Sequence, residues 1–501
     1  MPSPGLGLQE QLLLLEQDLQ RPHLPSLHPA QGQWPPHNDP GAGLGALYEA
    51  LAQERPQEVL DQCAGLQEHP HAGELAYLEG LAHAALGRHL LALRSFEAAQ
   101  ARGFLTPYVL FNAANACRAL ENTAEALRLF REALSLFPQF SECRHNLALA
   151  LIDAGDPQAA ERELRLLLRD QPSYVQAAFC LGNLLRDHQR EREAIEAFRL
   201  CLESSPAYPD AWNNLGLAQA AVGDLQTAMA SYRHALTIDH RFKPSRQNLA
   251  QALVQAKRHA EGLEQFEHFS ALDLGPFDRV VALQGQISCL LELDRYDDAL
   301  ALADRQDERC LQLMTRLHVL PVLYADDAQV AAVRRRWAED ARELYGLLEG
   351  LEQNHAAWET LYAHTWSITN FYLAYQMEDD RPLQELYAGI LDRILRPRLQ
   401  AFMQPLQQRD PADIRPLRVG VISPHLHNHN GAIWCLGWLE GLAGNPGYEI
   451  FTYNLGDKVD DGTQRFASMG VHRHLPLRAE NPEPMLQLSL IHISEPTRRY
   501  A

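Results

Sequence analysis

Small and large apolar residues recur at a fixed interval along more than half of the chain. Alanine stands at positions 92, 126, 160, 194 and 228, which are evenly spaced, and a glycine or alanine stands at a second, equally regular set of positions before them. Small residues let two helices approach closely, and a large residue fills the space beside them. The pattern therefore predicts five helical hairpins between Gly73 and Phe242. The large residue, four positions after each alanine, is Phe96, Phe130, Leu164, Phe198 or Tyr232.

The same register continues on both sides of these five units. Pro138, Pro172 and Pro206 close three of the hairpins, because proline cannot continue a helix. Residues 243–276 keep the apolar columns, and a small slip in register then leads to a hairpin around Tyr296–Ala299. Upstream, residues 44–72 look like a degraded unit. About seven to eight hairpins are expected, more than the three or so that a stable stack needs.

The recurring small and large positions resemble those of the tetratricopeptide repeat. The resemblance implies a right-handed solenoid with a concave inner groove. It is strongest in one unit, at Trp212, Leu215, Gly216, Gly223, Asp224, Ala228, Tyr232 and Ala235.

Other parts of the chain differ from the repeats in composition and in hydrophobic periodicity. Residues 1–43 combine a short helix around Leu12–Leu15 with a proline-rich linker, and residues 44–304 hold the repeats. Residues 305–415 keep helical periodicity without the regular repeat, which predicts a helical connector. At Pro416 the chain changes to the apolar run Leu417–Ser423, which is typical of a buried parallel strand. The predicted fold is mainly α, with a truncated Rossmann-like α/β fragment at residues 416–487.

That fragment has the elements of a βαβ unit. A helix is expected over about Gly431–Leu442 and a second strand over Tyr448–Leu455. A further helix and a short strand at Val471–Leu475 begin the next unit.

Composition narrows the classes of partner. The formal charge of −20 and the pI near 5.5 argue against nucleic acid, whose phosphates such a surface would repel. The chain has no run of about 18 apolar residues, so no membrane span is expected. The eight cysteines form no C-x-x-C pair and mostly lie in apolar helical stretches. They are typical of buried thiols in a reducing compartment, and a cytoplasmic location is expected.

The order of these parts resembles the bacterial, SPINDLY-type relatives of protein O-linked N-acetylglucosamine transferase. The resemblance covers roughly Leu44–Leu477 and rests on Thr369–Gln376, Asp380–Gln384, Arg418–Ser423 and Asn428–His429. It implies that the strand at 417–423 opens the N-terminal lobe of a GT-B glycosyltransferase. It also implies inverting transfer of N-acetylglucosamine, or a related sugar, from a UDP-sugar to Ser or Thr of proteins, without a further cofactor.

The family histidine falls on His429, which the resemblance makes the catalytic candidate. Two departures lie nearby, because His425–Leu426 replaces the common Asp-Phe pair and Asn430 replaces a proline. Independently, ligands of open α/β sheets bind beyond the carboxyl ends of the strands, where this loop lies. The alternative is a histidine that only caps the following helix. His425, His427 and His429 also alternate in the manner of metal ligands, but no carboxylate or cysteine is near them, so no metal is expected.

Asparagine recurs at one position of successive units. We call Asn112, Asn146, Asn214 and Asn248 the asparagine ladder; Cys180 interrupts it. An amide offers a donor and an acceptor, so a row of them can bind an extended peptide through its backbone. The family resemblance implies this use for protein substrates. Equally, the amides could bond to neighbouring repeats or to helix carbonyls.

Two expectations concern the end of the chain. A glycosyltransferase needs two lobes, and residues 416–487 supply only the start of the first. Residues 488–501 resemble a translated sequencing adapter. The sequence therefore predicts a glycosyltransferase fragment that is inactive alone. The competing function is a non-enzymatic repeat scaffold that binds peptides.

Overall fold

The computed structural model describes residues 44–66, 70–321, 323–352, 355–365, 378–399, 416–423, 426, 430–454 and 460–474. The expected N-terminal helix, the proline-rich linker, the segment Thr369–Gln376 and residues 488–501 lie outside these ranges. The chain forms two compact units, residues 1–273 and 274–501, which are described separately.

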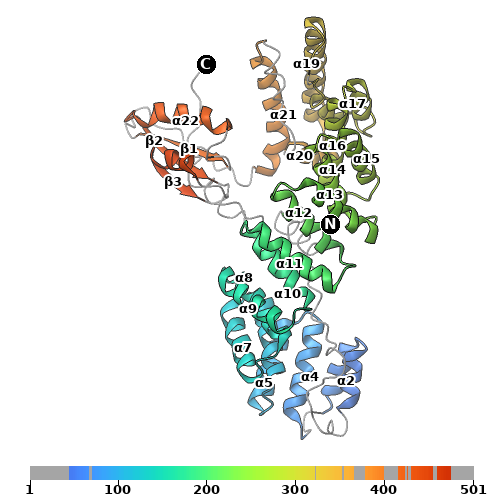
Figure 1. The fold of residues 1–501 in the computed structure, drawn as a ribbon, viewed down its shortest axis with the longest axis vertical. Coiled ribbons are helices and arrows are strands. Elements are labelled where there is room, and N and C mark those ends of the chain that lie inside the picture. Colours follow the sequence, from blue (N-terminus) through green and yellow to red (C-terminus); the bar gives the residue numbers. More distant parts are fainter. Residues whose placement is uncertain are drawn as a thin grey trace. The chain divides into compact units, whose positions relative to one another are not determined.

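The first unit is a succession of antiparallel helix pairs, coloured blue to green in Figure 1. Seven pairs follow one another between residues 45 and 270, and each helix packs against the next along the chain. The helices are α2 (Gly45–Ala52), α3 (Pro56–Cys63), α4 (Ala72–Ala85), α5 (His89–Ala101), α6 (Pro107–Ala119), α7 (Thr123–Leu136), α8 (Ser141–Asp153), α9 (Pro157–Asp170), α10 (Val175–Asp187), α11 (Glu191–Ser204), α12 (Pro209–Ala221), α13 (Leu225–Ile238), α14 (Lys243–Gln255) and α15 (His259–Ser270).

The periodic small and large residues form the contact between the two helices of a pair. The alanines of the regular column are fully buried. In three units the large ring lies directly on a glycine: a Cβ added at Gly182 would come within 2.5 Å of the Phe198 ring, and one at Gly216 within 2.5 Å of the Tyr232 ring. Glycine is therefore needed for this close approach, and the predicted hairpins are confirmed.

The turn inside each pair follows the same repeat. The residue two before the second helix has a positive φ in all seven pairs, namely Glu54 (+56°), Gly87 (+69°), Glu121 (+58°), Gly155 (+75°), Gln189 (+58°), Gly223 (+90°) and Lys257 (+60°). This left-handed conformation suits glycine and costs other residues about 1–2 kcal/mol. Four of the seven pairs therefore hold a non-glycine residue in a conformation that it disfavours.

Replacing Glu121, Gln189 and Lys257 together by glycine should stabilise the first unit. Each change relieves left-handed strain of about 1–2 kcal/mol but adds about 0.5–1 kcal/mol of chain entropy in the unfolded state. The expected sum is about 1–3 kcal/mol in urea unfolding followed by circular dichroism. The matched control, Gly155→Ala with Gly223→Ala, should destabilise the same unit. A loss of stability in the triple variant would show that these side chains hold the turns.

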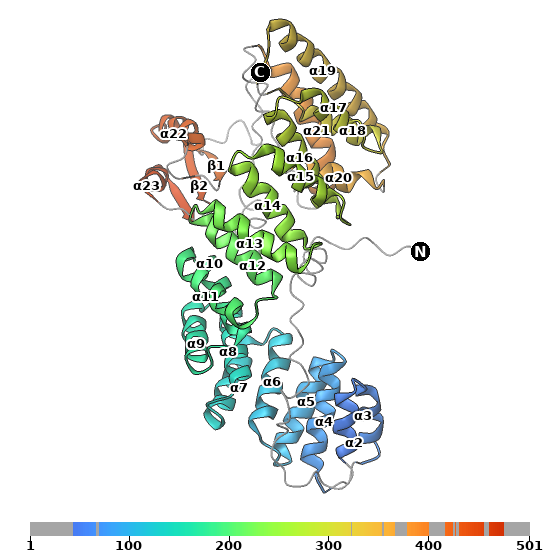
Figure 2. The same cartoon turned by 45° about the vertical axis from the view of Figure 1, so that its right-hand side comes forward.

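Six further helices begin the second unit. They are α16 (Pro276–Glu292), α17 (Tyr296–Ala303), α18 (Arg309–Leu317), α19 (Asp327–Gly350), α20 (Ala357–Thr365) and α21 (Arg381–Leu399). Figure 2 shows the long helix α19 running past α17 and α18. Trp337 of α19 is fully buried in their apolar core, and its Nε1 donates to the carbonyl oxygen of Leu317 at 2.9 Å. Of these helices, α18, α19, α20 and α21 lie within residues 305–415, where the sequence predicts a helical connector, whereas α16 and α17 precede it.

A small parallel sheet follows. Its strands β1 (Leu417–Ser423), β2 (Tyr448–Asn454) and β3 (Val471–His474) lie in sequence order, and α22 (Asn430–Ala443) and α23 (Asp461–Ala467) connect them. Ile450, Leu439 and Phe466 are buried together between the sheet and the helices. The expected order of strands and helices is confirmed to within one or two residues.

Two further observations bear on the setting of the protein. Within the described ranges, no helix combines the length and the apolar character needed to cross a bilayer. Among the cysteines whose side chains are described, Cys180 is half-buried and the others are buried, all as thiols.

Candidate functional site

The asparagine ladder lies on the first helix of four pairs. Asn112 is on α6, Asn146 on α8, Asn214 on α12 and Asn248 on α14, and all four side chains are half-buried. Because they hold one position of a regular repeat, they lie on the same face of successive helices. The interruption, Cys180 on α10, has the same half-buried position.

Each ladder amide donates a hydrogen bond to the preceding pair. Nδ2 of Asn146 lies 2.8 Å from Oδ1 of Asn115, and Nδ2 of Asn214 lies 2.8 Å from Oδ1 of Asn183. The two ends of the ladder use another acceptor, one position before the ladder column. Nδ2 of Asn248 donates to Oδ1 of Asn213 at 2.9 Å, and Nδ2 of Asn112 donates to the Tyr77 hydroxyl at 3.1 Å.

Tyr77, Asn115, Asn183 and Asn213 form what we call the second row. The sequence did not predict this row, because the residue one repeat after Asn115 is Leu149 and the residue one repeat after Asn183 is Leu217. The signal that could have found it is the return of asparagine at every second unit, from Asn115 to Asn183. The sequence left open whether the ladder amides contact neighbouring repeats, and the structure shows that their N–H groups do. The peptide-binding role of the ladder stays a prediction.

The second row also explains the gap at Cys180. The unit before Cys180 carries Leu149 at the position where Asn115 and Asn183 stand in other units. An asparagine at 180 would find no asparagine at that position, and the other second-row position of this unit holds His145. A buried N–H without a partner costs about 1–3 kcal/mol. A small apolar thiol avoids that cost.

The groups around the ladder are mostly neutral or paired. Burial lowers the pKa of His145 to about 4, so its imidazole is uncharged at neutral pH. The guanidinium of Arg118, one turn beyond Asn115, pairs with the carboxylate of Asp153 at 2.5 Å. The ladder thus offers hydrogen bonds without a strong net charge.

The catalytic candidate His429, with His425 and His427, lies outside the described residues. Its neighbour Leu426 is buried against Leu436 and Leu439 of α22, so an apolar residue is what this point of the loop requires. The strand ends nearby are described. Ser423, Asn454 and His474 are in register at the carboxyl end of the sheet, the end at which open α/β sheets bind ligands.

The face of β2 that carries Ile450 becomes polar toward that end. Ile450 packs in the apolar core, whereas Thr452 and Asn454, two and four residues further on, are buried polar residues. Oγ1 of Thr452 lies 2.7 Å from Nδ1 of His472 on β3. Polar residues are therefore concentrated toward the carboxyl end of β2, at the edge where the sequence predicts a ligand.

Comparison with known proteins identifies the helical pairs. Family profiles described as tetratricopeptide repeat match residues 64–139, 118–178 and 181–242. These residues are tetratricopeptide repeats. The profile matches cover a smaller part of the chain than the run of helix pairs in the first unit.

Individual relatives share only parts of the chain. The FK506-binding protein-like protein of Mus musculus is 30% identical over 131 residues, 24% of this chain and 37% of that protein. The protein O-mannosyl-transferase TMTC1 of Homo sapiens is 25% identical over 234 residues, 46% of this chain and 26% of that protein. The chain thus spans well under half the length of these relatives.

Two solved structures are similar to part of the chain. The crystal structure of YrrB, titled a TPR protein with an unusual peptide-binding site, is 18% identical with a TM-score of 0.32, covering 39% of this chain and 96% of that one. A crystal structure of MamA is 21% identical with a TM-score of 0.30, covering 31% of this chain and 91% of that one.

Beyond the matched tetratricopeptide repeats, a polar cluster joins α16 to three parts of the connector. The amide nitrogen of Gln284 on α16 lies 3.1 Å from Nδ1 of His318, after α18, and 3.2 Å from Nδ1 of His364 on α20. Nε2 of His318 lies 3.2 Å from the hydroxyl of Tyr387 on α21. All four side chains are buried. The cluster is a structural centre of the connector, because each element that it joins supplies one hydrogen-bonding group.

Burial sets the protonation of this cluster. It lowers the pKa of His318 to about 4, and burial together with the nearby His318 lowers the pKa of His364 to about 3. Burial also raises the pKa of Tyr387 to about 12. Both imidazoles and the phenol are therefore neutral at pH 7.

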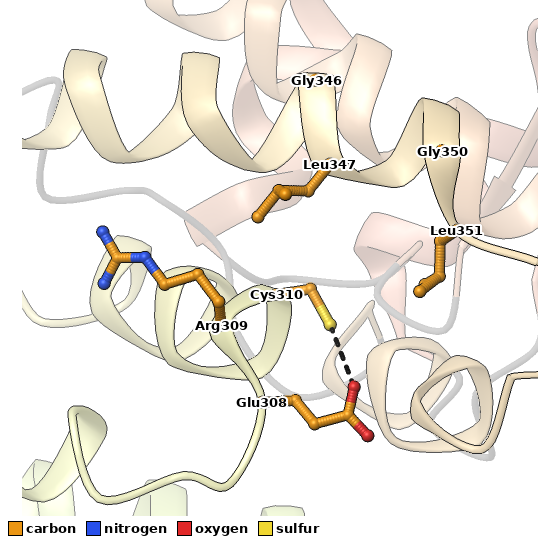
Figure 3. Close-up of a pocket in the computed structure, with 7 residues that line it drawn as sticks. All are labelled: Glu308, Arg309, Cys310, Gly346, Leu347, Gly350 and Leu351. Carbon is orange, nitrogen blue, oxygen red and sulfur yellow. Dashed lines mark hydrogen bonds between the residues drawn. The ribbon is translucent and has the colours of Figure 1, made fainter.

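The connector also has a surface hollow of about 370 Å³ (Figure 3). Its one thiol is not activated, because burial raises the pKa of Cys310. The cation beside it, Arg309, is already paired with Glu343 at 2.7 Å. The thiol of the hollow is therefore protonated at neutral pH, and its guanidinium is engaged in an ion pair. It is lined by Glu308, Arg309, Cys310, Gly346, Leu347, Gly350 and Leu351.

Proposed function

We propose that the tetratricopeptide repeats capture extended protein segments along the asparagine ladder for glycosyl transfer by the α/β lobe that begins at residue 416. The observation that carries the proposal is the ladder itself: half-buried amides at one position of successive units, held by bonds to the preceding unit. Such a row recognises a main chain whatever its side chains, which suits an enzyme that modifies many proteins.

Three observations support glycosyl transfer as the reaction. The C-terminal sheet is parallel, and buried polar residues gather near its carboxyl end, the end where a Rossmann-like lobe binds ligands. TMTC1 of Homo sapiens and Tmtc3 of Drosophila melanogaster, both named protein O-mannosyl-transferases, are 25% and 30% identical over parts of the chain. The motifs around Arg418–Ser423 resemble the O-linked N-acetylglucosamine transferases.

The proposed reaction is inverting transfer of N-acetylglucosamine, or a related sugar, from a UDP-sugar to Ser or Thr. The acceptor hydroxyl attacks the anomeric carbon as the bond to the diphosphate breaks, and the hydroxyl proton passes to a base. Capture by the repeats places the hydroxyl, and positioning of this kind is a large part of the rate enhancement. His429 is the proposed acid-base or orienting group, and the proposed reaction requires no metal or further cofactor.

A second function is favoured by the family matches, which fall only on repeats. In that case the protein is a peptide-binding scaffold without transferase activity. The two functions differ in one measurement, the incorporation of labelled sugar into acceptor proteins.

We expect His429→Ala, made in the complete gene product, to lower the transfer rate by roughly tens to thousands of fold, as for the loss of one positioned acid-base or oxyanion-stabilising group. The measurement is incorporation from labelled UDP-N-acetylglucosamine into a panel of acceptor proteins. His425→Ala is the matched control and should be much milder. No incorporation by the wild-type gene product would favour the scaffold, and equal rates for wild type and His429→Ala would remove this histidine from the catalytic site.

A further inference from the structure

The hydrogen bonds of the asparagine ladder run in one direction. In every case the amide nitrogen of a ladder residue donates to a second-row acceptor of the preceding unit. The side-chain amide of Asn112 has one possible orientation. Its Nδ2 also lies 2.9 Å from the backbone carbonyl oxygen of Tyr108, and a carbonyl oxygen can only accept a hydrogen bond. The N–H side of the ladder is thus engaged within the protein.

The side-chain carbonyl oxygens of the ladder make fewer hydrogen bonds within the protein than its amide nitrogens do. Among the described residues, no hydrogen bond reaches Oδ1 of Asn112 or of Asn248, although both side chains are only half-buried. At Asn146, a side-chain hydrogen bond with the adjacent His145 opposes the effect of burial on the pKa of that imidazole. At Asn214, Oδ1 accepts from Nδ2 of Asn213 at 3.2 Å. The ends of the ladder therefore have the most acceptor capacity left.

We propose that the second-row residues are positioning residues that turn the ladder oxygens toward the bound segment. This inference rests on the proposed capture of protein segments and names the chemistry of recognition. The ladder would bind an extended polypeptide through its main-chain N–H groups, with Asn112 and Asn248 as the strongest acceptors. Proline and esters, which lack that N–H, are disfavoured where the segment meets these two residues.

The chain offers matched variants for the second row. Leu149 and Leu217 stand, half-buried, at the position of Asn115 and Asn183 in alternate units, so leucine fits that position. Asn115→Leu should therefore leave the fold intact while releasing the amide of Asn146.

Conversely, Cys180→Asn needs an acceptor, which Leu149→Asn supplies. His145→Phe removes the imidazole that stands where Tyr77 and Asn213 stand, and phenylalanine already occupies that position at Phe111 and Phe179. In the His145→Phe background, the pair Leu149→Asn with Cys180→Asn should extend the ladder through its gap, whereas Cys180→Asn alone should not.

The test uses a peptide selected from a random library on the full wild-type chain, with binding followed by fluorescence anisotropy. Each main-chain amide of the peptide is replaced in turn by an ester, which removes one N–H. We expect one or more esters to weaken binding about two- to tenfold, the range for one net hydrogen bond, and to have no effect when Asn112→Ala or Asn248→Ala has removed the acceptor. Asn115→Leu should weaken binding by a similar factor, and in the His145→Phe background the Leu149→Asn, Cys180→Asn pair should strengthen it.

The outcomes separate the inference from the proposed function. A selected peptide that binds without any coupling between its esters and the ladder would overturn the inference and leave capture standing. Stronger binding by Cys180→Asn in the His145→Phe background without Leu149→Asn would also contradict it, since neither second-row position then holds an acceptor. If the library yields no binder, capture by the repeats fails and the inference fails with it. Circular dichroism of each variant separates lost binding from lost folding.

Discussion

Lowering the pH from 7 to 5 should destabilise the helical connector by on the order of 3–4 kcal/mol. Burial lowers the pKa of His318 to about 4 and that of His364 to about 3, whereas both titrate near 6.5 in the unfolded chain. Below pH 6.5 the unfolded state therefore binds protons that the folded state does not. Stability is fully present above that pH and is lost progressively as the pH falls toward 4.

Other groups should not produce the same loss in this range. The hydrogen bond from Arg309 lowers the pKa of Glu343, so the stability that this pair contributes is lost only below the ordinary glutamate range. In the first unit, His145 has a lowered pKa of about 4, and its effect should be about half that of the two connector histidines.

Hydrogen exchange with mass spectrometry can follow the connector and the repeats separately. Exchange in α16, α18, α20 and α21 should accelerate more steeply with falling pH than exchange in α12 and α13. His364→Asn keeps an acceptor near the Gln284 amide but does not titrate, so it should remove about half of the acid dependence of the connector. His145→Asn is the matched control in the other unit. An unchanged pH profile in His364→Asn would mean that other groups drive the acid transition.

Phe198→Ala should destabilise the repeats by about 3–5 kcal/mol, the usual cost of truncating a buried phenylalanine. The ring is fully buried, lies on Gly182 and packs against Phe179 with ring centroids 6.0 Å apart. Because glycine has no side chain that could move into the space, the cavity should remain largely open. Urea unfolding monitored by circular dichroism measures the loss.

Two variants calibrate that effect. Phe198→Leu copies Leu164, the residue at this position in the preceding unit, and should cost much less than the alanine change. Phe137→Ala removes a ring that is 37% exposed and should cost little. A small loss in Phe198→Ala itself would show that the two helices collapse onto the cavity.

Periodicity predicted the helical pairs well because one physical requirement repeats in every unit. The contact of Gly182 with Phe198 needs a small and a large residue at fixed spacing, and both are visible in the sequence. The first parallel strand could also be predicted, because Leu417–Ser423 is a short apolar run that follows a stretch of helical periodicity. A local sequence pattern is sufficient to predict an element where each residue type in the pattern has a single structural role.

The second row was missed because its members change identity. Tyr77, Asn115 and Asn213 all accept an amide N–H, but they occupy two different positions of the repeat and include a phenol. The connector cluster was missed for another reason. Gln284 and His364 lie far apart in the sequence, and nothing local to either predicts that they meet in a buried site. Long-range polar contacts depend on tertiary packing, which a single sequence does not encode in a simple period.

The alternation of Asn115 and Asn183 with Leu149 and Leu217 gives the groove a natural module of two hairpins. In each module the second hairpin, which carries Asn146 or Asn214, depends on an acceptor in the first. Deleting the single hairpin that carries Asn183 would put Asn214 opposite Leu149, whereas repeating the complete module that carries Asn183 and Asn214 would preserve the acceptors of Asn214 and of Asn248. Engineered grooves of different length should therefore be built in double steps.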